Sequence, residues 1–193
     1  MPERIQEIVE LAGNVAEAAG VVASDGDGEL RGREFLVTVI RPGEALSGRV
    51  YSQQACSEIA RQLEGARAFA DHLTRSELRE RAERSIRDMV GYYHGATVAP
   101  DGSVRARLRL LEHAAWLGQL IAGTLEHGRA DLVGISIDAL VDVDRSPGRP
   151  PTVVGCQRLM SADVVTRPSA GGRIERMVAS DREVPEERGE ELD

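Results

Sequence analysis

The spacing of hydrophobic positions changes from helical to extended near Phe35. Before that point, residues 4–19 repeat apolar side chains every three or four positions, which predicts an amphipathic helix. Residues 24–32, SDGDGELRG, have the glycines and aspartates of a turn-rich linker. The run EFLVTVIRPG, residues 34–43, then predicts a strand that ends at a Pro-Gly pair. The pattern separates an N-terminal helix and linker, residues 1–32, from a mixed domain that we assign to residues 33–180.

Two further segments of this domain have helical spacing. The first is SQQACSEIARQLEG, residues 52–65, in which Ser52 can cap the start and Gly65 can end the helix. The second is HAAWLGQLIAGTLEHG, residues 113–128, whose apolar face is expected to contain Trp116, Leu117, Leu120, Ile121 and Leu125. Between them, RSELRERAERSIRD, residues 75–88, is strongly charged and predicts a solvated helix or loop.

Extended patterns fill most of the remaining domain. ARAFADH, residues 66–72, predicts a short strand, and residues 89–111 predict a hairpin that turns at APDG. DLVGISIDALVD, residues 131–142, predicts a strand, and residues 153–168 supply the last strands. Six or seven strands with two or three helices indicate an α+β fold, organised as a small mixed or antiparallel β-barrel, closed or partly closed. Residues 181–193 are acidic and poor in apolar side chains, so we expect a disordered tail.

Composition narrows the classes of function. The formal net charge of −8 argues against non-specific nucleic-acid binding, and no apolar run approaches the ~18–20 residues of a membrane span. The N-terminus lacks the basic and apolar regions of a signal peptide. The two cysteines, Cys56 and Cys156, form no CxxC pair, which favours reduced core thiols over a disulfide or a zinc site. No metal is expected, and the absence of G-x-G-x-x-G and Walker patterns predicts no cofactor.

One hydroxyl and one imidazole have the placement of catalytic groups. Ser136 lies within the strand that follows Gly134, on the face opposite Ile135 and Ile137. His72 ends its predicted strand, where the chain leaves the sheet for a polar loop. Nucleophilic hydrolysis needs a hydroxyl, a base within hydrogen-bond reach and a group that orients the base. The alternatives are a half-buried strand with a solvated face for Ser136, and a structural role for His72.

Four segments in serial order carry a resemblance to a known family. They are FADHLTR, RSIRDMVG, GISIDAL and SADVVTRPSAGG, and they resemble the motifs of prohead (capsid maturation) proteases of tailed phages. VIRPGEALSGRVYSQQACSEIARQLEGARAF resembles the opening of the same family, so the likeness runs from about Phe35 to Ala179. The resemblance implies the fold of the herpesvirus assemblins, serine proteases built on a small β-barrel wrapped by helices.

The resemblance also implies the site residues. The histidine at the end of the DH strand is the general base, here His72, and the serine of the G-[IVL]-S strand is the nucleophile, here Ser136. The residue after the serine is small or polar in many relatives, whereas this chain has Ile137. The aspartate before VT-x-P is Asp163, which would orient His72. The alternative acids are Asp88 and Asp71, and Asp71 would point away from His72 on a continuous strand.

A turn after the last motif is a candidate oxyanion hole. Residues 167–172, RPSAGG, end in two glycines, so the backbone N–H groups of Arg167, Gly171 and Gly172 could bind a developing negative charge. An ordinary turn is the alternative reading of this segment.

The expected function is that of a prohead serine endopeptidase. It would cleave scaffold protein, major capsid protein and itself inside the procapsid, in the host cytoplasm, during capsid maturation and virion assembly. A homo-oligomer is compatible with this function, and no nucleic-acid or membrane partner is expected. The alternatives are a catalytically silent assembly or scaffolding protein that retains the fold, and a free-standing bacterial peptidase of the same fold.

Overall fold

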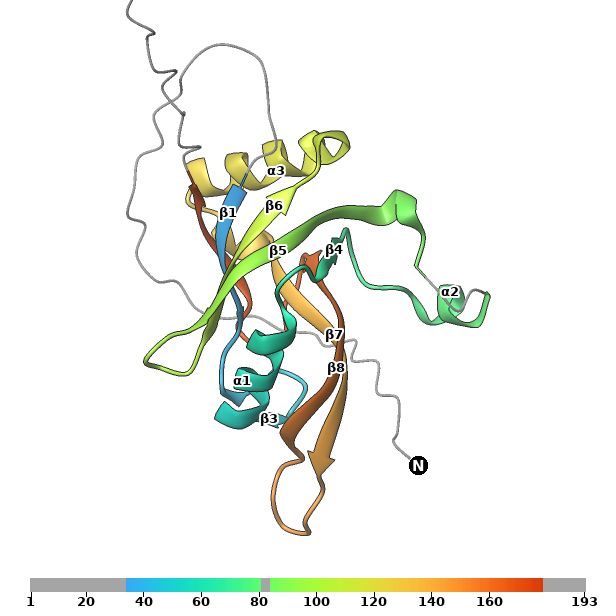
Figure 1. The fold of residues 1–193 in the computed structure, drawn as a ribbon, viewed down its shortest axis with the longest axis vertical. Coiled ribbons are helices and arrows are strands. Elements are labelled where there is room, and N and C mark those ends of the chain that lie inside the picture. Colours follow the sequence, from blue (N-terminus) through green and yellow to red (C-terminus); the bar gives the residue numbers. More distant parts are fainter. Residues whose placement is uncertain (1–33, 81–83, 179–193) are drawn as a thin grey trace, which may run out of the picture.

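The computed structural model describes residues 34–80 and 84–178, which form a mixed α+β structure with mostly antiparallel strands (Figure 1). The predicted N-terminal helix and linker, and the predicted acidic tail, lie outside the described residues. The described elements follow one another along the chain as β1(Glu34–Ile40), β2(Gly43–Glu44), β3(Val50–Tyr51), α1(Gln53–Gln62), β4(Arg67–Phe69), α2(Arg75–Glu80), β5(Met89–Val98), β6(Val104–Leu110), α3(Ala115–Glu126), β7(Gly134–Asp144), β8(Thr152–Val165) and β9(Arg173–Val178). Short 3₁₀ segments precede β5, α3 and β7.

The strands of the described residues form two sheets. The first has the order β4-β5-β6-β1-β9, and the second has the order β2-β3-β8-β7. A parallel bridge between Ala70 and Val164 joins the end of β4 to β8, so the sheets meet at this edge. The described strands form two sheets rather than one closed barrel, so the expected barrel wrapped by helices stays a prediction.

Local signals explain the two ends of α1. The Ser52 hydroxyl accepts a hydrogen bond from the backbone N–H of Ala55 at 3.1 Å, as the sequence predicts for an N-cap. Beyond the helix, Gly65 has a φ of +72°, a conformation that costs glycine little. The buried face of α1 contributes Ala55, Cys56 and Ile59 to the core. The helix packs against β8, β5 and β6, so it fills the space beside the sheets.

Helix α3 differs from its predicted packing. Leu117 and Ile121 are buried as expected, but Trp116 is 54% exposed and Leu120 is 49% exposed. These two residues are one turn apart, so the apolar surface of α3 is wider than the core that it covers. Figure 1 shows α3 lying across one end of β1 and β6.

The β7–β8 ribbon is the longest strand pair. Its antiparallel register shifts three times, between Asp138 and Ala139, between Leu140 and Val141, and between Asp142 and Val143. Each shift places one extra residue on β8, which is the arrangement of a β-bulge. Despite these bulges, residues 153–165 belong to one continuous strand, whereas the sequence pattern predicted several. The last strand of the described chain is β9, which the hydrophobic pattern did not indicate.

Candidate functional site

The chain bends sharply just before His72. Strand β4 ends at Phe69, three residues earlier than the predicted strand, and Asp71 has a φ of +61°. Aspartate tolerates this left-handed conformation better than most residues do. The N–H of Asp71 donates to the carbonyl of Val164 at 2.9 Å, and the N–H of Ala70 donates to the carbonyl of Asp88 at 3.1 Å. These bonds hold the residue before His72 directly against β8.

The acid that contacts His72 is Asp163. The Nδ1 atom of His72 lies 2.6 Å from Oδ2 of Asp163, whose side chain is completely buried. Because an ionised carboxylate only accepts hydrogen bonds, this contact assigns a proton to Nδ1. In the neutral imidazole, Nε2 then has a free lone pair that can accept a proton. Nε2 is buried and has no hydrogen-bond partner among the described residues.

The two alternative acids have other positions. Asp71 is exposed and contributes its backbone N–H and carbonyl to the site. Asp88 ends the 3₁₀ segment Ile86–Asp88, and its carbonyl accepts from Ala70. The structure therefore brings Asp163, and neither alternative, into hydrogen-bond contact with His72 within the described chain.

Ser136 lies directly opposite Asp163. The β7–β8 register pairs the two residues across the ribbon. Side chains of opposed residues point to the same face of a sheet, with Cβ atoms about 4.5–5.5 Å apart. The hydroxyl of Ser136 therefore lies on the face where Asp163 meets His72. Among the described residues no hydrogen bond joins Ser136 to His72, and such catalytic contacts often tighten only when substrate binds.

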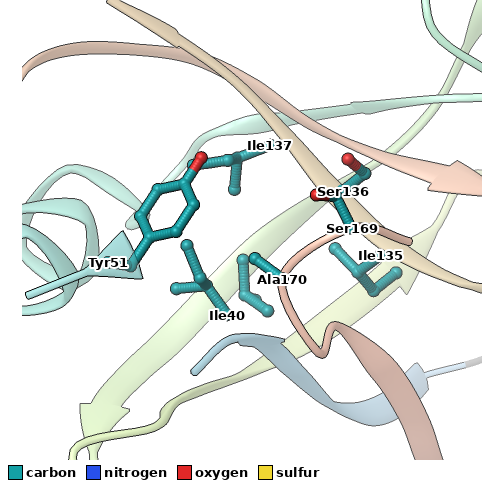
Figure 2. A pocket seen from close by; sticks show the side chains of 8 residues that line it. Ile40, Tyr51, Ile135, Ser136, Ile137, Ser169 and Ala170 are labelled. Carbon is teal, nitrogen blue, oxygen red and sulfur yellow. The ribbon is translucent and has the colours of Figure 1, made fainter. Parts of the chain in front are cut away.

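Ser136 also lines a small pocket. The wall is formed by β1, β3, β7 and the turn after β8, through Val39, Ile40, Tyr51, Ile135, Ser136, Ile137, Ser169 and Ala170. Figure 2 shows Tyr51, Ile40 and Ile137 at one end of this pocket and the hydroxyls of Ser136 and Ser169 at the other. The serine thus lies at the border of a small depression that both apolar and hydroxyl side chains line.

The turn at residues 167–172 packs tightly against the start of β7. A Cβ atom on Gly172 would lie 1.8 Å from the carbonyl oxygen of Ile135, and one on Gly134 would lie 2.5 Å from Cγ of Pro168. The turn therefore fills the space beside Gly134 and leaves no room there for a substrate backbone. The carbonyls of Ser169 and Ala170 accept from the N–H groups of Leu46 and Arg41, which fixes the turn.

The three oxyanion-hole candidates have different surroundings in this turn. Gly172 contacts the residue next to Ser136, and Gly171 has a φ of +73° and packs against the side chain of Arg41. Arg167 is exposed, and the turn contributes Ser169 and Ala170 to the pocket rather than any of the three candidates. Gly172 therefore lies beside the serine strand, Gly171 lies next to it in the chain, and Arg167 lies at the start of the same turn; the oxyanion-binding role of all three stays a prediction.

Sequence reasoning missed Arg84. Its Nη1 atom lies 2.5 Å from Oδ2 of Asp163, and its Nη2 atom lies 2.5 Å from the carbonyl oxygen of Asp71. The guanidinium also stacks 4.0 Å above the ring centre of Phe69. Arg84 belongs to the charged segment that we interpreted as solvated, and its many neighbouring arginines gave no signal that this one is buried.

Two further hydroxyl groups, on β5 and β8, are buried. The hydroxyl of Tyr93 and that of Ser161 are buried and have no hydrogen-bond partner in the described part of the chain. Burial raises the pKa of Tyr93 well above its ordinary value of 10, and the negative charge of Asp163 raises it further. The Tyr93 phenol therefore stays protonated at every physiological pH. Alternation along the hairpin could have indicated that Tyr93 faces inward, because Tyr93 pairs with Leu108 on β6 whereas Tyr92 pairs with Arg109.

The remaining candidate groups have structural contacts. His94 lies 3.2 Å from Oε2 of Glu34, and Nε2 of His113 lies 2.8 Å from the carbonyl oxygen of Met89. Cys56 and Cys156 are free and buried, as the sequence predicts, and burial raises their pKa values to about 12 and about 11. In residues 34–80 and 84–178, no group of His, Cys, Asp and Glu side chains has the arrangement of a metal site. No helix of the described chain is long and apolar enough to span a membrane.

The comparisons with known proteins leave this geometry as the principal guide. No family model, no curated protein and no solved structure matches the chain.

Proposed function

We propose that the chain is a serine endopeptidase in which Ser136 is the nucleophile, His72 the general base and Asp163 the orienting acid. The observation that carries this proposal is the 2.6 Å contact between Nδ1 of His72 and the fully buried carboxylate of Asp163, on the residue that is paired with Ser136. A hydroxyl, an imidazole and a buried carboxylate are the groups that acyl transfer by a serine requires.

The chemistry follows from the tautomer. With its proton on Nδ1, His72 has a lone pair on Nε2 that accepts the Ser136 proton as Oγ attacks the scissile carbonyl carbon. The imidazolium formed is stabilised by Asp163 and then gives its proton to the leaving amine. Water, deprotonated by the same Nε2, attacks the acyl-enzyme ester and releases the second product and free Ser136.

The turn beside β7 supports a site for the oxyanion. The tetrahedral intermediate carries its negative charge on the former carbonyl oxygen, and backbone N–H groups lower its energy when they point to that oxygen. Gly171 and Gly172 belong to a turn that is fixed by two backbone hydrogen bonds and touches the residue before Ser136. We assign the oxyanion-binding N–H groups to these two glycines.

The biological assignment rests on the resemblance to phage prohead proteases. The bridge between Ala70 and Val164, and the contacts of β7 with β1 and β9, support a curved arrangement of the sheets like the small barrel of assemblins. In this proposal the substrates are scaffold protein, major capsid protein and the enzyme itself, and cleavage takes place inside the procapsid. A catalytically silent assembly protein and a free-standing bacterial peptidase are the alternative functions.

Covalent labelling tests the proposed nucleophile. The full chain is treated with an aryl phosphonate diester, which reacts with activated serines, and the modified peptide is located by mass spectrometry. We expect one adduct on Ser136 in the wild type and none in Ser136→Ala. Ser57→Ala is the control, because the Ser57 hydroxyl lies on α1, where it donates to the carbonyl of Gln53 and does not line the pocket, so this variant should label like the wild type. Labelling that persists in Ser136→Ala would refute the assignment.

Co-expression separates the endopeptidase from its alternatives. Wild type and Ser136→Ala are each expressed with the neighbouring capsid and scaffold genes, and the fragments are identified by mass spectrometry. Fragments that appear only with the wild type support a maturation protease. Labelling of Ser136 without cleavage of these proteins would favour a peptidase with another substrate.

A further inference from the structure

Arg84 joins the two segments that form the proposed triad. One end of its guanidinium contacts the carboxylate of Asp163 on β8, and the other contacts the carbonyl of Asp71, the residue before His72. The planar, rigid fork of arginine fixes the distance and the angle between its two partners, which a flexible ammonium group does not. Arg84 therefore couples the position of the acid to the position of the base.

The surroundings of Arg84 limit its freedom. Its side chain is only 12% exposed, and the Cζ atom of its guanidinium lies over the ring of Phe69, 4.0 Å from the ring centre. Stacking on the aromatic face adds an attraction that hydrogen bonds in the plane do not supply. Arg84 is consequently held by two hydrogen-bond acceptors and by the ring of Phe69.

Arg84 also places a positive charge beside the buried carboxylate of Asp163. A carboxylate that is removed from water is very costly unless it is paired and hydrogen-bonded. Arg84 and His72 contact the same oxygen, Oδ2, whereas Oδ1 has no partner among the described residues. Because guanidinium is always positive, Asp163 keeps a countercharge while His72 is neutral and ready to accept a proton.

From these contacts we infer that Arg84 is a positioning residue of the site, which orients the Asp163 carboxylate and fixes the bend that presents His72 to Ser136. The inference rests on the proposed function for its kinetic consequence, and its structural part stands on the contacts alone. Arg84 touches no group that would react, so it acts through Asp163 and Asp71.

Nuclear magnetic resonance of the full chain tests the structural part. The chain has four histidines, so labelling with ¹⁵N-histidine gives few signals, and His72→Ala and His94→Ala assign two of them. In the wild type we expect the Nδ1 proton of His72 to exchange slowly with water. In Arg84→Met it should exchange at least about tenfold faster, because the carboxylate loses its fixed orientation. Arg107→Met is the matched control, because Arg107 contacts Glu34, a carboxylate that contacts another histidine, His94. It should leave the His72 signal unchanged.

Phosphonate kinetics test the functional part. The inactivation rate is measured against reagent concentration, which separates the maximal rate from the concentration at half-saturation. Misplacement of a reacting group by about 1 Å can cost about 100-fold in rate. We expect Arg84→Met to lower the maximal rate by about 10- to 100-fold with little change in half-saturation. Arg84→Lys, which keeps the charge but loses the fork, should lie between Arg84→Met and the wild type.

The outcomes separate this inference from the proposed function. An unchanged His72 signal in folded Arg84→Met would overturn the positioning role, whether or not Ser136 reacts. A wild type that never reacts at Ser136, together with a faster-exchanging His72 proton in Arg84→Met, would refute the proposed function and keep the positioning role. If Arg84→Met does not fold, Arg84→Lys decides: a changed His72 signal with native circular dichroism supports the inference, and an unchanged one overturns it.

Discussion

The described part of the chain contains two clusters in which a carboxylate contacts a histidine and at least one arginine. In the first, Asp163 contacts His72 at 2.6 Å and Arg84 at 2.5 Å. In the second, Glu34 contacts His94 at 3.2 Å and Arg107 at 2.8 Å, on the first sheet. The side chains of the first cluster are 0%, 20% and 12% exposed, in the order carboxylate, histidine and arginine. Those of the second are 15%, 31% and 49% exposed in the same order.

The residues that lie opposite the two carboxylates in the sheets differ more than the histidines and arginines that contact them. The residue paired with Asp163 is Ser136, whereas Glu34 is paired with Arg109 on one side and with Val178 on the other. A hydroxyl opposite the carboxylate gives the histidine a proton to accept, and neither an arginine nor a valine does. The comparison teaches that a His–carboxylate–Arg cluster is common ion-pair chemistry. What makes the first cluster a candidate site is its burial and its opposed serine.

Removing each histidine gives the largest expected contrast. His72→Ala should reduce the rate of phosphonate labelling at Ser136 by several orders of magnitude, because no base remains to accept the serine proton. His94→Ala should label within about twofold of the wild type. The double variant Ser136→Ala/His72→Ala should hydrolyse peptides hardly more slowly than either single variant, since residues of one catalytic unit are not additive. If Ser136 of His72→Ala is labelled as fast as in the wild type, His72 is not the general base and, like His94, has no part in the reaction.

Neutralising each carboxylate gives a smaller contrast. Asp163→Asn keeps the size of the side chain but can hold the wrong tautomer of His72, so peptide hydrolysis should fall by up to about 10⁴-fold if the serine-protease precedent applies. Glu34→Gln should leave the rate unchanged. If Asp88→Asn abolishes hydrolysis while Asp163→Asn does not, the acid has been assigned to the wrong residue.

The second cluster should be visible in acid stability rather than in activity. Burial by itself raises the pKa of Glu34, but the hydrogen bonds from Arg107 and His94 outweigh it, so the net pKa lies below the ordinary 4.5. A group with a lowered folded pKa stabilises the protein fully above its unfolded pKa and loses this contribution as the pH falls through the folded value. Wild type should therefore be more stable than Glu34→Gln near neutral pH, by about 1 kcal/mol or less.

Thermal melts across pH values measure this difference. The melting temperatures of wild type and Glu34→Gln should converge as the pH falls below about 4.5, where the glutamate becomes protonated in both folded and unfolded chains. A gap that stays constant from pH 7 to pH 3 would show that Glu34 stabilises the protein by packing rather than by charge.

The sequence predicted those parts of the fold that depend on local chemistry. Ser52 and Gly65 marked the ends of a helix, and the APDG turn with alternating Val104, Ala106 and Leu108 marked a hairpin, because capping and strand alternation act between near neighbours. Strand β9 was missed because its charged residues leave too few apolar positions to show alternation. Strands β2 and β3 have two residues each, so they form only through pairing with distant segments.

The site was predicted only in part, for the same reason. His72, Ser136 and Asp163 were proposed from motif order, and the structure brings His72 and Asp163 into contact and sets Ser136 opposite the acid. Their catalytic roles stay predictions. Arg84 could not be found, because its burial depends on where Phe69 and Asp71 lie after folding. The bend at Asp71 was also unpredicted, since a left-handed aspartate has no pattern that distinguishes it from a strand end.

The three bulges of the β7–β8 ribbon determine where the chain can change length. All of them lie on the side of the Ser136–Asp163 pair that leads to the loop at residues 145–151, and each leaves one residue of β8 without an opposed partner. Deleting such a residue closes its bulge and keeps the pairing on both sides, so single-residue insertions and deletions can accumulate there during evolution. A deletion of Ala162 has no bulge to absorb it. It would turn Asp163 to the opposite face of the ribbon, because successive residues of a strand alternate faces. One half of this ribbon is therefore free to vary in length, and the other half must keep an exact count.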